Sequence, residues 1–162
     1  SGVDLPVPLL IKMAKEIETV KCFKIECAQA ASKLRKLVIE GGDVIEGPFD
    51  GEEGITLFAD LEAGATGNMS SAMIPDLIKP VVLDYLAGEF DKSEDKYNNI
   101  LPLINYENRQ CGFRATKVIM KEGGVINSDF CRHPIPPLEE QTKAGLIKLV
   151  KKYDPIALSW GK

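Results

Sequence analysis

The stretch that decides the fold is Val20-Lys21-Cys22-Phe23-Lys24-Ile25-Glu26, a short run of strand-forming residues with a lysine inside it. Read at the period of two of a strand, Phe23 and Ile25 share one face and Lys24 lies on the other. If a covering helix buries the apolar pair, Lys24 points to the opposite side. In an edge strand that side is water, whereas in a closed parallel barrel it is the lumen.

A lysine in such a lumen is chemically informative. An isolated ammonium is costly there unless it is paired or neutral. Desolvation lowers the pKa of a lysine, and a neutral amine can attack a carbonyl carbon to form a Schiff base. Spacing alone leaves a second interpretation open, in which Lys24 is a strand-edge residue with its stem on apolar surface and its head in water.

Composition bounds the class of protein. The chain has 162 residues, with 44% hydrophobic and 27% charged residues, which is typical of one soluble globular domain. A net charge of -4 without a basic stripe argues against nucleic-acid binding. The apolar runs are too short to span a bilayer, and residues 1–4 do not resemble a signal peptide. We therefore expect a cytoplasmic protein with no membrane partner.

The cysteines Cys22, Cys27, Cys111 and Cys131 form no C-x-x-C pair, so we expect reduced thiols and no metal centre. A zinc site built from Cys131 and His133 is the alternative, although their spacing fits no usual finger pattern.

Hydrophobic periodicity predicts helices that alternate with short strands in the first part of the chain. The predicted strands are 20–26, 43–47 and 65–71, with 48–51 as a loop. The predicted helices are 6–17, 28–40, 52–64 and 75–88, followed by 91–107, 112–122 and 137–152 without strands between them. Trp160 is expected to anchor the tail by packing. Such alternation predicts an α/β fold with a parallel sheet.

A closed barrel of parallel strands and helices needs eight strands and about 250 residues. The pattern of this chain is therefore typical of the last part of such a barrel. We expect residues 1–88 to be the C-terminal part of a (β/α)8 TIM barrel and residues 89–162 to be a C-terminal helical extension. Three strands alone leave two open sheet edges and an uncovered face.

Several short blocks carry a family resemblance: Phe23-Lys24-Ile25-Glu26, Glu46-Gly47-Pro48, Asp50-Gly51-Glu52-Glu53, Gly64-Ala65-Thr66-Gly67, Leu101-Pro102-Leu103-Ile104-Asn105, Glu107-Asn108-Arg109-Gln110 and Arg132-His133-Pro134. With them the sequence resembles the superfamily of dihydrodipicolinate synthase and N-acetylneuraminate lyase, and within it the dehydratases of L-2-keto-3-deoxyarabonate. The resemblance implies a (β/α)8 barrel whose sixth strand carries Lys24. It covers the whole chain but only the C-terminal half of such an enzyme, without the first five strands.

The resemblance also implies a reaction. Lys24 would condense with the C2 ketone of a 2-keto-3-deoxy sugar acid, and the protonated imine would allow loss of a C3 proton and of the C4 hydroxyl, giving 2-oxoglutarate semialdehyde. No metal or organic cofactor is implied beyond the covalent Schiff base on Lys24. The implied partners are the missing N-terminal half of the barrel and further copies of the chain in a homotetramer.

Further site residues are predicted around Lys24. Glu26 shares its strand face, where it could move the C3 proton or form a salt bridge that orients a loop. Gly47, Asn68, Met69 and Ser70 are placed by the resemblance at the C-terminal ends of strands seven and eight, where barrel enzymes hold substrate. For Asn68, a contact with a substrate hydroxyl and a capping role in a turn both remain open.

Two other functions remain open. The same lysine could serve a pyruvate-dependent aldolase or a dihydrodipicolinate synthase-like enzyme. The chain could instead be an inactive fragment or an interaction module that needs its missing half.

Overall fold

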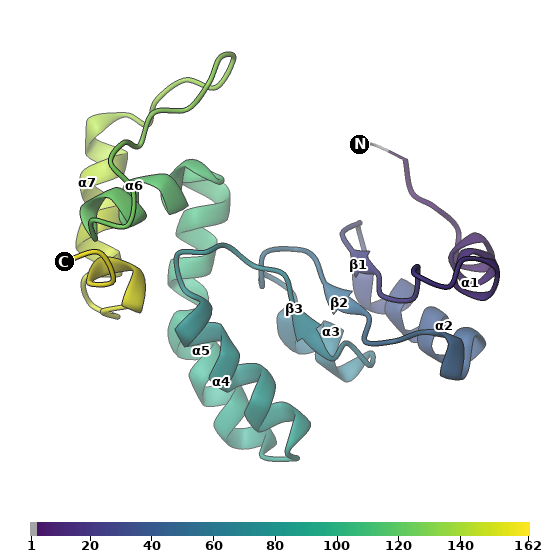
Figure 1. Ribbon diagram of the computed structural model, residues 1–162. Coiled ribbons are helices and arrows are strands. Elements are labelled where there is room, and N and C mark those ends of the chain that lie inside the picture. Colours follow the sequence, from purple (N-terminus) through teal and green to yellow (C-terminus); the bar gives the residue numbers. More distant parts are fainter. Residues whose placement is uncertain (1–2) are drawn as a thin grey trace.

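The computed structural model describes residues 3–162 and contains three short strands among helices (Figure 1). The elements, in chain order, are α1 (Val7–Glu16), β1 (Lys24–Ile25), α2 (Ala30–Gly41), β2 (Phe49–Asp50), α3 (Leu57–Glu62), β3 (Gly67–Asn68), α4 (Pro75–Leu86), α5 (Phe90–Tyr106), α6 (Arg114–Glu122) and α7 (Glu140–Val150). A π-helical turn, Glu107–Cys111, joins α5 to α6, and 3-10 turns occupy Gly42–Val44 and Ile156–Leu158.

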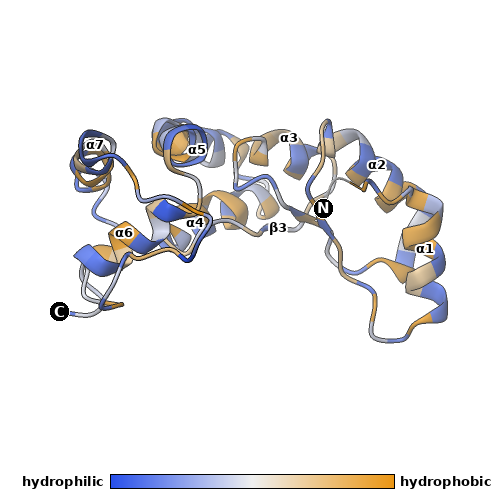
Figure 2. Cartoon of the chain, turned by 90° about the horizontal axis from the view of Figure 1, so that it is seen from above, coloured by the Kyte–Doolittle hydropathy of each residue, from blue (hydrophilic) through white to orange (hydrophobic). Residues whose placement is uncertain are grey.

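The strands form one parallel sheet in the order β1-β2-β3, as the alternating pattern predicts. Lys24 lies beside Phe49, which lies beside Gly67, and these positions share one face. Ile25, Asp50 and the last residue of β3 occupy the other face. Helices α1, α2 and α3 follow one another along the same side of the sheet (Figures 1 and 2).

The second strand was predicted in the wrong place. Residues 43–47 were expected to be extended and 48–51 a loop, but the strand is Phe49–Asp50. Gly47 adopts a left-handed backbone with φ of 41°, which interrupts the extended run before the strand begins. The apolar pair Val44 and Ile45, which suggested a strand, packs instead against the cluster between α1 and α2.

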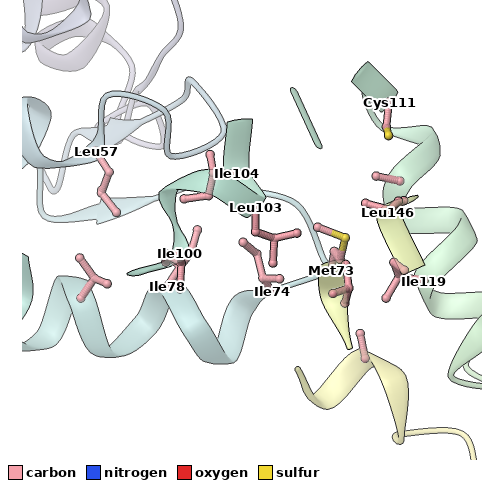
Figure 3. Close-up of a cluster of buried hydrophobic side chains, with 14 of the residues drawn as sticks. Leu57, Met73, Ile74, Ile78, Ile100, Leu103, Ile104, Cys111, Ile119 and Leu146 are labelled. Carbon is pink, nitrogen blue, oxygen red and sulfur yellow. The ribbon is translucent and has the colours of Figure 1, made fainter. Parts of the chain in front are cut away.

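Two hydrophobic clusters hold the described residues together. The smaller joins α1, α2 and β1, and it contains nine buried residues, Ile25 among them. Phe23 packs against it, so the predicted apolar face of the first strand is confirmed. The larger contains 19 buried residues, mostly from α4, α5, α6 and α7 (Figure 3).

Helices α4 and α5 lie side by side and contribute to one core, which runs across the boundary expected at residue 88 (Figure 1). That domain boundary stays a prediction. The buried Ser93 hydroxyl donates to the carbonyl of Val81 at 2.8 Å, which ties the two helices together. The expected role of Trp160 was wrong, because its side chain is 69% exposed and the tail is anchored by Ala157 and Leu158.

Candidate active site around Lys24

Lys24 lies on the sheet face opposite to the buried Ile25, as the strand period predicts. Its ammonium is 2.8 Å from a carboxylate oxygen of Glu26. That hydrogen bond raises the pKa of Lys24, and the charges of Glu53 and Asp50 raise it further, while burial opposes them. The expected neutral, desolvated amine is therefore not found among the described residues, because the side chain is 36% exposed and paired.

The pairing has a chemical consequence of its own. A carboxylate within hydrogen-bond distance can accept the ammonium proton and release the neutral amine that attacks a ketone. Glu26 is thus placed to hold the Lys24 ammonium. Lys24 and Glu26 also line a cavity of about 540 Å³ beside β1, together with Phe23 and Cys27.

Gly51 directly follows β2, and the Lys24 side chain packs closely against its backbone. A Cβ atom at Gly51 would lie 2.8 Å from Cγ of Lys24 and 2.7 Å from the carbonyl oxygen of Ile25. The amide of Gly51 donates to that same carbonyl at 2.9 Å. The close approach of the two strands therefore depends on the missing side chain.

Behind the sheet, a buried polar network joins β2, β3 and α3. The fully buried Asp50 carboxylate accepts from the Glu52 amide at 2.9 Å and from the side-chain amide of Asn68. Asp60 is also fully buried, and the Thr56 hydroxyl donates to it at 2.7 Å. Burial, and then the proximity of Asp50, raises the pKa of Asp60 to about 7 although the Thr56 bond lowers it.

This network changes the interpretation of Asn68. Its register places it on the face of Ile25 and Asp50, opposite to Lys24, and its amide is held by Asp50. The predicted contact with a substrate hydroxyl does not follow from this geometry. The alternative of a structural amide fits the observed bond.

The other residues predicted after β3 lie at its C-terminal end. The amide of Met69 donates to the Asp50 carbonyl at 2.9 Å, and its side chain is 45% exposed. The Ser70 hydroxyl donates to the Glu53 carbonyl at 3.2 Å, which links the loops that follow β2 and β3.

Gly47 was placed wrongly. It precedes β2 by two residues, so it lies at the N-terminal end of the strand, away from Glu26, Gly51 and Met69. The reason is the shift of the strand itself from 43–47 to Phe49–Asp50.

Three acidic residues near the site, Asp60, Glu53 and Glu107, were given no role from the sequence. Glu53 stands in a left-handed backbone with φ of 58°, which is uncommon outside glycine. Glu107 is only 4% exposed. Glu53 and Glu107 belong to the family blocks at 50–53 and 107–110, whereas Asp60 belongs to none of the quoted blocks. Residues 3–162 contain no group of three or more potential metal-ligating side chains.

Comparison with known proteins decides the family. A model of the "Dihydrodipicolinate synthetase family" matches residues 1–153. The chain belongs to the dihydrodipicolinate synthetase family. A curated relative, "L-2-keto-3-deoxyarabonate dehydratase" of Azospirillum brasilense, is 51% identical over 160 residues, which are 99% of this chain and 52% of that protein.

Solved structures of the family share the fold. Dihydrodipicolinate synthase from Aquifex aeolicus superposes with a TM-score of 0.83 at 19% identity, over 94% of this chain and 51% of that one. The chloride-inhibited enzyme from Acinetobacter baumannii in complex with pyruvate gives 0.79 at 23% identity, over 93% of this chain and 51% of that one. The chain therefore has the fold of part of a family barrel together with helices, and it spans about half the length of its relatives.

Proposed function

We propose that this chain supplies the Schiff-base lysine of a dehydratase that acts on L-2-keto-3-deoxyarabonate. The observation that carries the proposal is Lys24, which lies on the strand face opposite to Ile25, with Glu26 2.8 Å from its ammonium. Family membership and the 51% identity to a protein named for this activity support it.

The proposed reaction begins when Glu26 accepts a proton from Lys24. The neutral amine adds to the C2 ketone, and loss of water gives a protonated imine. Removal of a C3 proton sends its bonding electrons into the imine and forms an enamine. The enamine breaks the C4–O bond, and the hydroxyl leaves with a proton as water. Tautomerisation and hydrolysis then release 2-oxoglutarate semialdehyde and free lysine. The lysine is the electrophilic catalyst, and the scheme uses no metal or organic cofactor.

The proposal includes a partner. The sheet has three strands, whereas a closed barrel of this type has about eight. We propose that the remaining strands pair with the free edges of β1 and β3 and enclose the face that carries Lys24. A homotetramer and a cytoplasmic location belong to the same proposal, and the four free cysteines agree with a reducing compartment. None of the helices formed by residues 3–162 is long and apolar enough to cross a membrane.

The test traps the imine. The chain is produced together with the N-terminal half of the Azospirillum brasilense relative, which supplies the other strands. The assembly is incubated with pyruvate and borohydride, and the adduct is mapped by mass spectrometry. We expect reduced pyruvate on Lys24 and none in the Lys24→Ala variant, while the matched surface variant Lys36→Ala keeps the adduct. An unmodified Lys24 in a folded assembly would falsify the proposal.

The same assembly separates the alternatives. Formation of a semialdehyde from L-2-keto-3-deoxyarabonate without release of pyruvate supports the dehydratase. Release of pyruvate indicates an aldolase, for which the structural likeness to dihydrodipicolinate synthases is the supporting observation. The chain without its partner is tested in parallel, because its open sheet edges favour an inactive half.

A further inference from the structure

A second cavity lies where the helical extension meets the C-terminal ends of the strands. It has a volume of about 350 Å³, and its lining includes Glu53 from the loop after β2, Ser71 from the loop after β3, Glu107 from the π-helical turn and Thr116 from α6. The extension therefore contributes side chains at the end of the sheet where barrel enzymes hold substrate.

The hydrogen bonds of Ser71 indicate how Glu107 is held. The Ser71 hydroxyl accepts from the Met73 amide at 3.0 Å and from the Thr116 hydroxyl at 3.0 Å. A serine has two acceptor positions and one hydrogen to donate, so its own hydrogen remains for Glu107, which lies within hydrogen-bond reach. The Ser71 and Thr116 hydroxyls both lie within hydrogen-bond reach of the Glu107 carboxyl group, which also lines the cavity.

Glu107 is held as a neutral acid up to about neutral pH. Burial raises its pKa to about 7, the charge of Glu53 raises it further, and the hydroxyl bonds oppose this change. The other titratable groups nearby are Cys111, whose pKa burial raises to about 11, and Arg114, whose Nε donates to the Cys111 carbonyl at 2.8 Å. A protonated carboxyl has one O–H to donate, and Glu107 lines the cavity.

Glu53 supplies the opposite hydrogen-bonding property. Burial raises its pKa, while the nearby Lys24 ammonium lowers it, so the cavity lies within electrostatic reach of the imine lysine. As a carboxylate, Glu53 only accepts hydrogen bonds. A cavity with one neutral donor and one anionic acceptor suits an alcohol, which both accepts and donates. It disfavours a second carboxylate or a phosphate, which Glu53 repels.

We propose that Glu107 is a specificity residue of the reaction site, where it donates a hydrogen bond to a hydroxyl of the keto acid at the end remote from the imine. Glu53 accepts the hydrogen of the same hydroxyl. The inference rests on the proposed function and extends it, since it names the hydroxylated end of the substrate as the group that the extension recognises. It explains why a helical segment outside the barrel strands carries a buried acid.

The test compares two keto acids in the assembled barrel. L-2-keto-3-deoxyarabonate has the distal hydroxyls, and pyruvate lacks them. The KM and kcat for the sugar acid and the rate of pyruvate trapping are measured between pH 6 and pH 9 for the wild type, Glu107→Gln and Glu107→Ala. Asn105→Ala is the matched control, because this exposed side chain donates to the Leu101 carbonyl of its own helix, α5.

For the wild type we expect the KM for the sugar acid to rise about tenfold as Glu107 ionises, the effect of about one lost hydrogen bond. Glu107→Gln keeps a donor and should give a KM that is flat across this range, whereas Glu107→Ala should have a high KM already at pH 6. Pyruvate trapping should stay within about twofold in all variants. Asn105→Ala should behave as the wild type.

Two results would overturn the inference: a pH-dependent KM that persists in Glu107→Gln, or equal losses for the sugar acid and pyruvate. If Glu107→Ala does not fold, the pH profile of the near-isosteric glutamine variant decides alone. Failure of pyruvate trapping in the wild type counts against Lys24 and the proposed reaction. Normal trapping with an unchanged KM in the variants counts against Glu107 only.

Discussion

The two halves of this chain differ in how large a hydrophobic core each one forms. The helical segment from α4 onwards holds most of a core of 19 buried residues, whereas the strand-bearing segment has nine in a separate cluster. Each strand pairs over only two residues, and the face that carries Lys24 is partly exposed. The proposed chemistry therefore lies in the segment with fewer buried residues, and most of the buried core lies in the other.

The helical segment also holds part of the strand-bearing segment in place. The single hydrogen of the Tyr97 hydroxyl on α5 lies within reach of two carbonyl oxygens in the loop that follows β2, Ile55 at 2.5 Å and Gly54 at 3.0 Å. That loop also carries Glu53. The helical segment thus fixes a loop of the strand-bearing segment. The following variants examine this division, from the largest expected effect to the smallest.

Leu103→Ala tests the packed segment. Leu103 is fully buried in the larger cluster (Figure 3), so its truncation should lower the free energy of unfolding by about 3–5 kcal/mol, from lost burial and the cavity left behind. Leu34→Ala should cost nearer to about 2 kcal/mol, because Leu34 lies in the smaller cluster of nine buried residues. Urea denaturation of both variants gives the comparison, and equal losses would contradict it.

Asp60→Asn tests the buried acid network. The pKa of Asp60 is about 7 in the folded chain and near 3.8 in the unfolded chain, so the fold binds its proton more tightly. That contribution to stability is fully present below about pH 4 and is lost as the pH rises to about 7. Each pKa unit corresponds to about 1.4 kcal/mol. The asparagine variant should lose less stability between pH 5 and pH 8 in urea titrations, and an unchanged slope would refute the assignment.

Gly51→Ala tests how closely the strands must approach at Lys24. The new methyl group would meet the Ile25 carbonyl and the Lys24 stem, so we expect about 1–3 kcal/mol of destabilisation and loss of pyruvate trapping. Gly88→Ala is the control, because its φ of 80° is strained for alanine but no atom lies within 4 Å. Retained trapping in Gly51→Ala would contradict this expectation, because it would show that the Lys24 side chain can avoid the new methyl group and still react.

Lys143→Met tests the surface of the helical segment. Asp129 is bridged by Lys121 at 2.7 Å and Lys143 at 2.6 Å, and these bonds hold its pKa well below the usual range. Because the pairs are partly exposed, loss of one should cost less than about 1 kcal/mol. Thermal unfolding at low and high salt measures it, and the difference should shrink with salt. A larger loss would show that this segment depends on its charges.

The sequence was most informative where the hydrophobic periodicity and the residues that start or stop a helix agree. The predicted helix from Pro75 coincides with α4 because proline at its first turn and an apolar stripe both mark it. The second strand failed because Val44 and Ile45 look like strand residues but are apolar contacts for α2. Short strands depend on their neighbours, and pattern alone cannot locate two paired residues.

The site divides in the same way. Lys24 could be singled out because a lysine inside an apolar strand is a local anomaly and because the family resemblance falls on it, and Glu26 because it shares that strand face; their roles stay predictions. Asp60 and Glu107 carry no such anomaly, since acidic residues are common on helices and only tertiary packing buries them. The sequence placed Asn68 at a strand end but gave no sheet face for it, because its face depends on the register of the paired strands.

The π-helical turn that carries Glu107 also constrains how this segment can evolve. A π turn holds one residue more than an ordinary α-helical turn. Deleting a residue of 107–111 would regularise this turn and shorten the connection to Gly112, where the helix ends with a φ of 59° before α6 begins. Substitutions at this joint are therefore the changes open to natural variation, and a change in length there would misalign α6 and α7 together.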